Sequence, residues 1–540
     1  MPAKTSPSAW RQFRRRWRVL RRRSPRERWV IGIAAGLLLA VSASLLWWQR
    51  PWTLNDVSSS SLVDLQPQDT AASLLFSADQ SDRLFRSLST EADWLKALPP
   101  DFLEPLIDQA RDRLAIWLPS SQPQILGLGA GQLQPAIALE LTQPEPLLDR
   151  LKTLERQQQW RVEQRSGQSL VGRLGDRYSL LLLRNRYLVL SESDATLRRL
   201  LAAYLGERTL TQSADYRRLC NSAPAAELRL YFDWPVLQTA SSQAGDAWGL
   251  PAVAQAVCAD FATQPEGIQV LGKALTSPDG EAPPPARTRR PLQELRSLVP
   301  AETVLWFESV DLEQLWQTIS GGPIAAQLPS GQQFDRDFES LTGTQLQRDW
   351  LSWSQGSYAI GVVQNPDTAT QTQFRAGLIL LAHASNRRQA EQSWQRLDQH
   401  LQKTGQLKVV TQAGATLWQL PDGRPIARHG WLPNNVSFLA VAAGTSLNLP
   451  PQGDRASLAN TPTAVLTGDG PSDRLILKLT QLRQLALLPL PKLLQDRLQP
   501  FDQLHLQWQA VQAGVTPFEL WLTLPPAEPA EPNDSATRDN

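Results

Sequence analysis

The hydrophobic and polar positions along this chain follow two periods, one typical of strands and one typical of helices. In LHLQWQAV (504–511) and FELWLTL (518–524), apolar residues recur at every second position, which predicts strands with one solvated face. DRYSLLLLRNRYLVLSES (176–193) holds two β-prone runs on either side of a polar turn at 184–186. These patterns predict hairpins and therefore antiparallel pairing.

Other segments have the helical period. Leu147, Leu151 and Leu154 lie four and three residues apart, which would place them on one face of a helix. A second predicted helix contains Trp394, and Ser385 is its candidate N-cap. Because alternating strands have one apolar face, we expect helices to cover that face. The chain is thus predicted to be α+β, with antiparallel sheet and helices packed on one face.

The predicted elements occur twice in the same order. PQDTAASLLFSADQSDRLFRSL (67–88) parallels PAETVLWFESVDLEQLWQTI (300–319), since each has a proline, a threonine, an apolar strand and an amphipathic helix. Further along, PAIALEL (135–141) parallels AGLILLAH (376–383), and each precedes a predicted helix. The order of these pairs predicts a tandem, internally duplicated protein.

We place the two α+β copies at residues 57–276 and 292–525. Between them, 277–291 is rich in proline and polar residues, so it is predicted to be an extended linker. Residues 526–540 have the composition of a disordered tail.

An uncharged stretch, WVIGIAAGLLLAVSASLLWW, fills residues 29–48. As a helix rising about 1.5 Å per residue it would cross a hydrocarbon core of about 30 Å, with Trp29 at one interface and Trp47 and Trp48 at the other. It therefore predicts a transmembrane anchor followed by a stem at 49–56. A signal peptide cleaved after AVSAS is the main alternative, and a buried soluble helix is another.

Basic residues crowd the segment before this stretch, residues 1–28, where ten arginines and Lys4 face a single acid, Glu27. Because basic residues stay on the cytoplasmic side, everything after the anchor is predicted to lie outside the cytoplasm. The same run would attract anionic lipid head groups, with RNA or DNA binding as the alternative, whereas the rest of the chain has no nucleic-acid footprint. The residues that we expect to fix the topology are Arg14, Arg15, Arg16, Arg21, Arg22 and Arg23.

The chain has two cysteines, Cys220 and Cys258, which could pair in an oxidising compartment. Two free, buried thiols are the alternative, since AVAQAVCADF would place Cys258 on an apolar stripe of a helix. The spacing does not resemble a metal site.

Motifs that carry chemistry are absent from the sequence. There is no nucleophile elbow, zinc-binding helix, phosphate loop or paired CxxC, so no catalytic, cofactor-binding or metal-binding residue is predicted. Paired carboxylates leave no fixed spacing, so they remain open as a catalytic device. The histidines stand apart from one another, at His383, His400, His429 and His505.

Twenty tryptophans are many for this length. Trp160, Trp306 and Trp394 fall at apolar positions of predicted strands or helices, where they would fill the core. Trp353 and Trp431 lie nearer predicted turns, and they are the candidates for exposed aromatic surface.

With its anchor, its repeated proline-threonine-strand-helix opening and its apolar hairpins, the chain resembles the domain-of-unknown-function family numbered 3352, from about Trp29 to Leu524. Members of that family are uncharacterised, mostly cyanobacterial proteins with one N-terminal span. The resemblance implies a location in the inner or thylakoid membrane, with the bulk of the chain periplasmic or lumenal, and it supplies no catalytic residues.

Three functions follow as hypotheses. The first is a binding or scaffold protein for an unknown envelope protein partner, without evident enzyme activity, which a flat uncharged patch would favour. The second is an envelope enzyme that acts on a polymer, which two carboxylates in a cleft would favour. The third is a carrier of an apolar ligand, which an apolar cavity would favour.

Overall fold

The structure is a computed structural model. It describes residues 61–77, 110–119, 133–166, 169–175, 178–206, 208–220, 226–237, 254–275, 293–310, 312–313, 316, 331–364, 375–405, 407–412, 414–441, 457–458, 472–485, 498–509 and 514–525. The predicted basic segment, anchor, stem, linker and tail lie outside these ranges, and so do the predicted interface tryptophans and topology-fixing arginines. Among the described residues, no helix is both long enough and apolar enough to cross a membrane.

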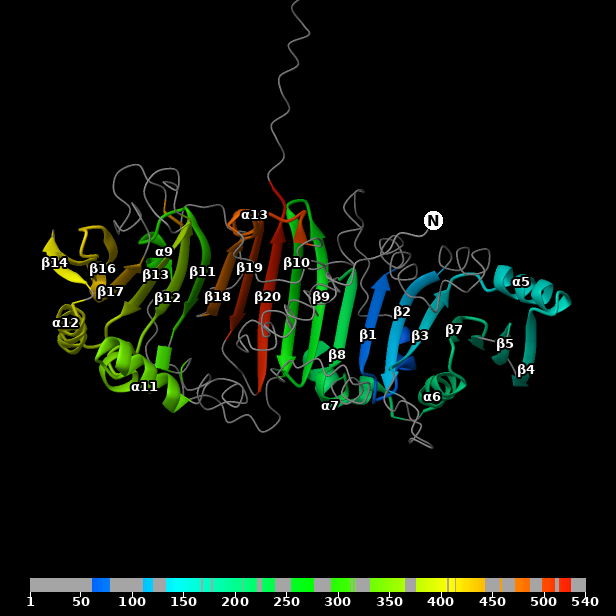
Figure 1. The fold of residues 1–540 in the computed structure, drawn as a ribbon. Coiled ribbons are helices and arrows are strands. Elements are labelled where there is room, and N and C mark those ends of the chain that lie inside the picture. Colours follow the sequence, from blue (N-terminus) through cyan, green and yellow to red (C-terminus); the bar gives the residue numbers. More distant parts are fainter. Residues whose placement is uncertain are drawn as a thin grey trace, which may run out of the picture.

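The described strands form one sheet of twenty, in which every pair of neighbours is antiparallel (Figure 1). From one edge inward, the order in the first half of the chain is β4 (Trp160–Ser166), β5 (Ser169–Leu174), β6 (Tyr178–Leu183), β7 (Tyr187–Ser191), β3 (Leu133–Leu141), β2 (Ala110–Pro119), β1 (Ala72–Ser77), β8 (Leu228–Asp233), β9 (Ala256–Gln264) and β10 (Gly267–Leu275).

From the other edge inward, the second half repeats this order strand for strand. Its order is β14 (Lys408–Gln412), β15 (Ala415–Gln419), β16 (Pro425–Leu432), β17 (Val436–Val441), β13 (Ala376–His383), β12 (Tyr358–Gln364), β11 (Thr303–Ser309), β18 (Ser472–Lys478), β19 (Gln503–Gln509) and β20 (Val515–Thr523). The coarse prediction of an α+β chain built on antiparallel sheet is therefore confirmed.

Strands β10 and β20 join the two halves into a single sheet. They hold the same position in the repeated order, and the pair at their centres is Leu271 and Glu519. Because equivalent strands pair antiparallel about equivalent residues, an approximate two-fold axis passes through this pair. The openings of the two halves also match, since Thr70 Oγ1 donates to the carbonyl of Pro67 and Thr303 Oγ1 to that of Pro300, each at 2.7 Å.

Helices lie against both faces of the sheet, so the prediction of helices on one face was wrong. Leu180 and Leu182 of β6 pack in one cluster with the three leucines of α5 (Glu145–Arg156). Leu181 and Leu183 pack in another cluster with α6 (Asp194–Tyr204). Successive side chains of a strand point to opposite faces, so this apolar strand is buried on both faces.

The other described helices are α7 (Ala214–Cys220), α9 (Gln293–Ser297), α11 (Gly331–Thr342), α12 (Arg387–Lys403) and α13 (Leu479–Gln484). Short helical segments are η2 (Ser61–Leu65), η3 (Leu210–Gln212), η5 (Leu346–Leu351) and η6 (Pro433–Asn435).

Several predicted elements are present as expected. Leu147, Leu151 and Leu154 are the buried residues of α5. Strands β6 and β7 flank the predicted turn, where Arg184 and Asn185 have positive φ. Such a turn matches the right-handed twist of a hairpin.

Each half has a largely buried arginine at the same place in its sheet, and the acid that pairs with it lies on a different neighbouring strand. In the first half, Arg229 Nε on β8 donates to Asp260 Oδ1 on β9 at 2.7 Å. In the second half, Arg474 on β18 is opposite Gln507 on β19, and its acid is Glu308 on the other side, on β11. On β11, Glu308 lies opposite Arg474. The equivalent position of the first half, opposite Arg229 on β1, is occupied by Leu75.

His505 on β19 lies beside this buried charge, and it is almost wholly buried. Burial and the positive charges of Arg474, Arg296 and Lys478 lower the pKa of its imidazole to about 4. The unfolded chain therefore takes up this proton first, near pH 6.5, so the contribution of His505 to stability is present above that pH and is lost as the pH falls toward 4. Urea titrations between pH 7 and 4 measure how the free energy of unfolding falls with pH. We expect it to fall less steeply in the His505→Gln variant than in the wild type. An equally steep fall in the variant would contradict this role of His505.

Candidate functional site

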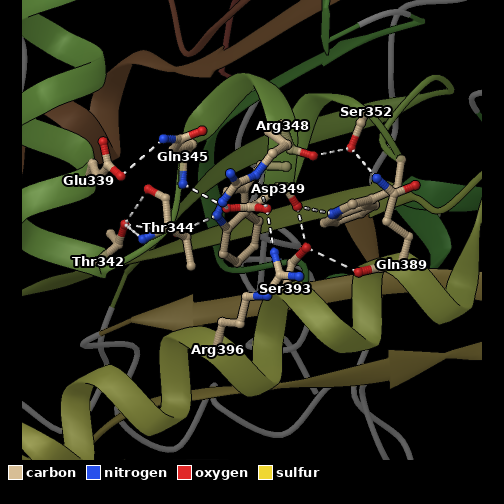
Figure 2. Close-up of polar contacts among 12 residues, drawn as sticks. Glu339, Thr342, Thr344, Gln345, Arg348, Asp349, Ser352, Gln389, Ser393 and Arg396 are labelled. Carbon is tan, nitrogen blue, oxygen red and sulfur yellow. Dashed lines mark hydrogen bonds and ion pairs between the residues drawn. The ribbon is translucent and has the colours of Figure 1, made fainter.

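A polar cavity of about 360 Å³ opens between the π-helical segment η5 and the first turns of α12. Figure 2 shows the side chains of Arg348, Arg396 and Ser393 meeting at Asp349. All of the side chains that line it are charged or polar: Arg348, Asp349, Asn386, Arg388, Gln389, Gln392, Ser393 and Arg396.

The start of α12 sets the position of one wall. Asn386 caps the helix, because its side chain accepts a hydrogen bond from the backbone N–H of Gln389 at 3.2 Å. The predicted cap, Ser385, was wrong by one residue: its hydroxyl donates to the carbonyl of Trp353 at 2.8 Å instead. Trp394 of the same helix is buried as predicted. Asn386, Gln389 and Ser393 lie on the part of α12 that borders the cavity.

Asp349 holds the cavity together. Its side chain is only 3% exposed, and it accepts hydrogen bonds from the backbone N–H of Gln345 at 2.8 Å, from Arg348 Nε at 3.1 Å and from Arg396 Nη1 at 2.6 Å (Figure 2). Burial on its own raises the pKa of this carboxyl, but the hydrogen bonds from Arg348 and Gln345 and the two arginine charges outweigh it and leave the pKa lowered. Asp349 is therefore a fixed anion at neutral pH.

The backbone of the same residue ties η5 to its surroundings. The carbonyl of Asp349 accepts from Trp353 Nε1 at 2.6 Å and from the hydroxyl of Ser393 on α12. Trp353 is 2% exposed, so the prediction that it is surface-exposed was wrong. Its indole packs beside that of Trp350, which meets Trp394 edge-on at 4.6 Å between ring centroids. These three packed tryptophans hold η5 against α12.

Positive charge exceeds negative charge in the cavity. Arg348, Arg388 and Arg396 face one carboxylate, that of Asp349. The side chains of Arg348 and Arg396 are 66% and 52% exposed, so solvent reaches the guanidinium groups that Asp349 positions. Within the described parts of the chain, Arg388 forms no hydrogen bond or ion pair. This arrangement can bind an anion.

The corresponding helix of the first half has a different character. Leu147, Leu151 and Leu154 of α5 match the buried residues Ala390, Trp394 and Leu397 of α12 in spacing. By that match, Glu145 occupies the position of Arg388, and the first turn of α5 is acidic. The two helices thus share the spacing of their buried residues but differ in charge, since Glu145 replaces Arg388 in the first turn of α5.

Replacing Asp349 with alanine is expected to lower the free energy of unfolding by about 2 kcal/mol, because a part-buried backbone N–H and two guanidinium groups lose a charged acceptor. Urea denaturation measures this loss. Asp349→Asn keeps one acceptor oxygen and is expected to lose less, while Asp422→Ala, which breaks the exposed pair with Arg424, is a control expected to change little. An Asp349→Ala variant as stable as the control would contradict this role.

Of the predicted site residues, the structure describes the two cysteines. Cys220 at the end of α7 and Cys258 on β9 form a disulfide with Cα atoms 5.6 Å apart, both buried in the first half. Cys258 lies on a strand and not on the helical stripe that was considered. Among the described residues there is no group of three or more potential metal ligands.

Sequence reasoning missed the cavity. The pattern that could have indicated it is the recurrence of polar residues four apart at Arg388, Gln392 and Arg396, which places them on one stripe of a helix. Asp349 could not be predicted as a site residue, because the local sequence QRDW does not indicate that this carboxylate is buried and pairs with two arginines.

The fold and the site define an α+β protein with a continuous antiparallel sheet and a positively charged polar cavity in its second half. The chain belongs to the DUF3352 family of proteins of unknown function, whose sequence pattern matches residues 119–468. That range is narrower than the resemblance predicted, and it includes the whole cavity.

Solved structures of TP0453 in crystal forms I and III are distantly similar to this chain. Each is 8% identical to it, with 44% of this chain and 85% or 86% of TP0453 covered, at a TM-score of 0.28. A TM-score this low does not establish a shared fold. No curated protein sequence matches the chain.

Proposed function

We propose that this chain is a membrane-anchored, extracytoplasmic binding protein whose ligand is an anion held in the Asp349 cavity. The observation that carries the binding part is the set of three arginines around one buried carboxylate. Such guanidinium groups are preset donors for carboxylate, sulfate or phosphate oxygens. The cavity has a single carboxylate, so it does not favour an enzyme with paired carboxylates. None of its lining side chains is apolar, so it does not favour a carrier of an apolar ligand.

The location rests on the sequence and on the disulfide. The uncharged stretch at 29–48 has the length of one membrane crossing, and the basic segment before it favours a cytoplasmic N-terminus in contact with anionic head groups. A buried disulfide between Cys220 and Cys258 is typical of an oxidising compartment. Together they favour a periplasmic or lumenal position for the second half and its cavity.

We also infer that the two halves are diverged copies of one unit, near 57–276 and 292–525. The repeated strand order, the matching proline-threonine contacts and the shared buried arginine support this origin. An experimental structure in which the second half paired its strands in another order would contradict it.

A reporter enzyme that is active only outside the cytoplasm tests the location. Fused after Asn540, it is expected to be active, because one crossing with a cytoplasmic N-terminus leaves the C-terminus outside. An inactive reporter with the fusion intact in the membrane would overturn the orientation. Sequencing of the mature N-terminus tests the anchor separately, since a start near Ser44 would show cleavage and remove the tether.

A further inference from the structure

We propose that the ligand of the Asp349 cavity is a phosphate monoester carried by a polar, hydroxyl-rich group such as a sugar. The proposal rests on the anion-binding function above, and it goes further by naming the charge of the anion and the chemistry of the group attached to it.

The charge of the cavity favours a doubly charged anion. Three guanidinium groups and the one ionised carboxylate leave two positive charges to be balanced. A phosphate monoester carries about −1.5 to −2 at neutral pH, so it balances both charges. A carboxylate or a phosphodiester carries one negative charge and would leave a positive charge unbalanced.

The donors that remain free suit an oxyanion with three terminal oxygens. Arg348 uses Nε and Nη2 on Asp349, and Arg396 uses Nη1, so each keeps other N–H groups for a ligand. Arg388 stands in the first turn of α12, where the helix dipole also favours negative charge. Asp349 keeps two of the three guanidinium groups in place before the ligand arrives, which reduces the entropy lost on binding.

The remaining lining indicates what the phosphate is attached to. Side-chain amides of Asn386, Gln389 and Gln392 complete the wall, and they can both donate to and accept from hydroxyl groups. The volume of about 360 Å³ lies in the range of small-molecule sites, about 300–1,000 Å³, so the cavity has room for more than a bare ion. Because every lining side chain is charged or polar, the cavity offers an acyl chain or an aromatic ring little complementary surface.

Calorimetric titration of the full chain in neutral detergent micelles tests the proposal. Glucose 6-phosphate is expected to bind at pH 8 at least about tenfold more tightly than glucuronate, which offers similar hydroxyls with one negative charge. The Arg388→Gln variant is expected to bind glucose 6-phosphate at least about tenfold more weakly than the wild type. Arg387→Gln removes the same charge one residue away, from a side chain that pairs with Glu391 and stacks over Trp431, and is expected to change binding less than about twofold.

Titrations at lower pH distinguish the effect of protonating the ligand from the effect of protonating the protein. Between pH 8 and 5 the phosphate monoester takes up a proton, since its second pKa is about 6, and binding is expected to weaken about tenfold. Sulfate stays doubly charged over this range, so its binding is expected to stay constant. The other acids and histidines on α11, η5 and α12 are Asp335, Asp337, Glu339, Glu391, Asp398 and His400. A parallel loss of sulfate binding would assign the pH dependence to the protein and overturn the proposal.

Each remaining outcome is decisive. If glucuronate binds as tightly as glucose 6-phosphate and both depend on Arg388, the phosphate assignment is overturned while anion binding stands. If phosphatidic acid in the micelles binds and glucose 6-phosphate does not, the phosphate is carried by a lipid and the hydroxyl-rich group is overturned. If no anion binds in a manner that depends on Arg388, the proposed function falls with the inference.

Discussion

The Glu308→Ala variant is expected to lose about 3–5 kcal/mol of folding free energy. Glu308 is fully buried, and its carboxylate accepts from Trp306 Nε1 at 2.8 Å and pairs with Arg474 at 3.3 Å and Arg296 at 3.6 Å. The Nε atoms of both arginines are buried and form no hydrogen bond. Removing the carboxylate therefore leaves two largely buried guanidinium groups without an acid, and Arg474 keeps only its hydrogen bond to Gln507, which costs more than the ion pair itself contributes.

Two variants make this measurement interpretable. Glu391→Ala breaks the exposed pair with Arg387 on α12 and is expected to cost less than about 1 kcal/mol. Glu308→Leu combined with Arg474→Met replaces charge with apolar volume, as Leu75 does in the first half, and is expected to recover part of the loss. Urea denaturation compares all three, and a Glu308→Ala variant no less stable than Glu391→Ala would show that the buried network does not need its acid.

Removing the disulfide is the second large effect. In the double variant Cys220→Ala with Cys258→Ala, the unfolded chain regains the freedom of a loop whose ends are 38 residues apart, which the loop-entropy relation puts at about 4 kcal/mol. Both sulfurs are buried against the apolar core of the first half, so alanine also loses some packing. The urea midpoint of the double variant is expected to fall well below that of the oxidised wild type.

Reduction provides the matching control. Dithiothreitol is expected to lower the urea midpoint of the wild type toward that of the double variant and to leave the double variant unchanged. Equal midpoints for the oxidised wild type and the double variant would contradict a stabilising role for the disulfide.

The sequence predicted local structure well where one period dominates. The leucines of α5 and the β6–β7 hairpin follow from spacing alone, since a period of 3.6 or 2 determines which side chains share a face. The sequence led to a wrong prediction, helices on one face only, where a strand is buried on both faces. Leu180 to Leu183 are consecutive apolar residues, so no alternation revealed that helices cover both sides of β6.

Long-range arrangement could not be predicted in the same way. That β10 pairs with β20 depends on which edges of two similar units meet, and neither strand encodes its partner. Cys258 was considered on a helix because AVAQAVCADF has apolar residues at helical spacing, yet pairing with β8 and β10 makes it a strand. Trp353 lies next to a turn in the sequence, but the carbonyl of Asp349 and the packed indoles bury it.

The proposed binding function depends on the Asp349 cavity, and one comparison decides whether that cavity binds anions. Inorganic phosphate is titrated at pH 8 into the full chain, into Arg388→Gln and into Arg387→Gln. Arg388→Gln is expected to bind at least about tenfold more weakly than Arg387→Gln, although both have lost one arginine from the same turn of α12. Equal affinities for the two variants would show that phosphate responds to the overall charge of the protein and not to this cavity.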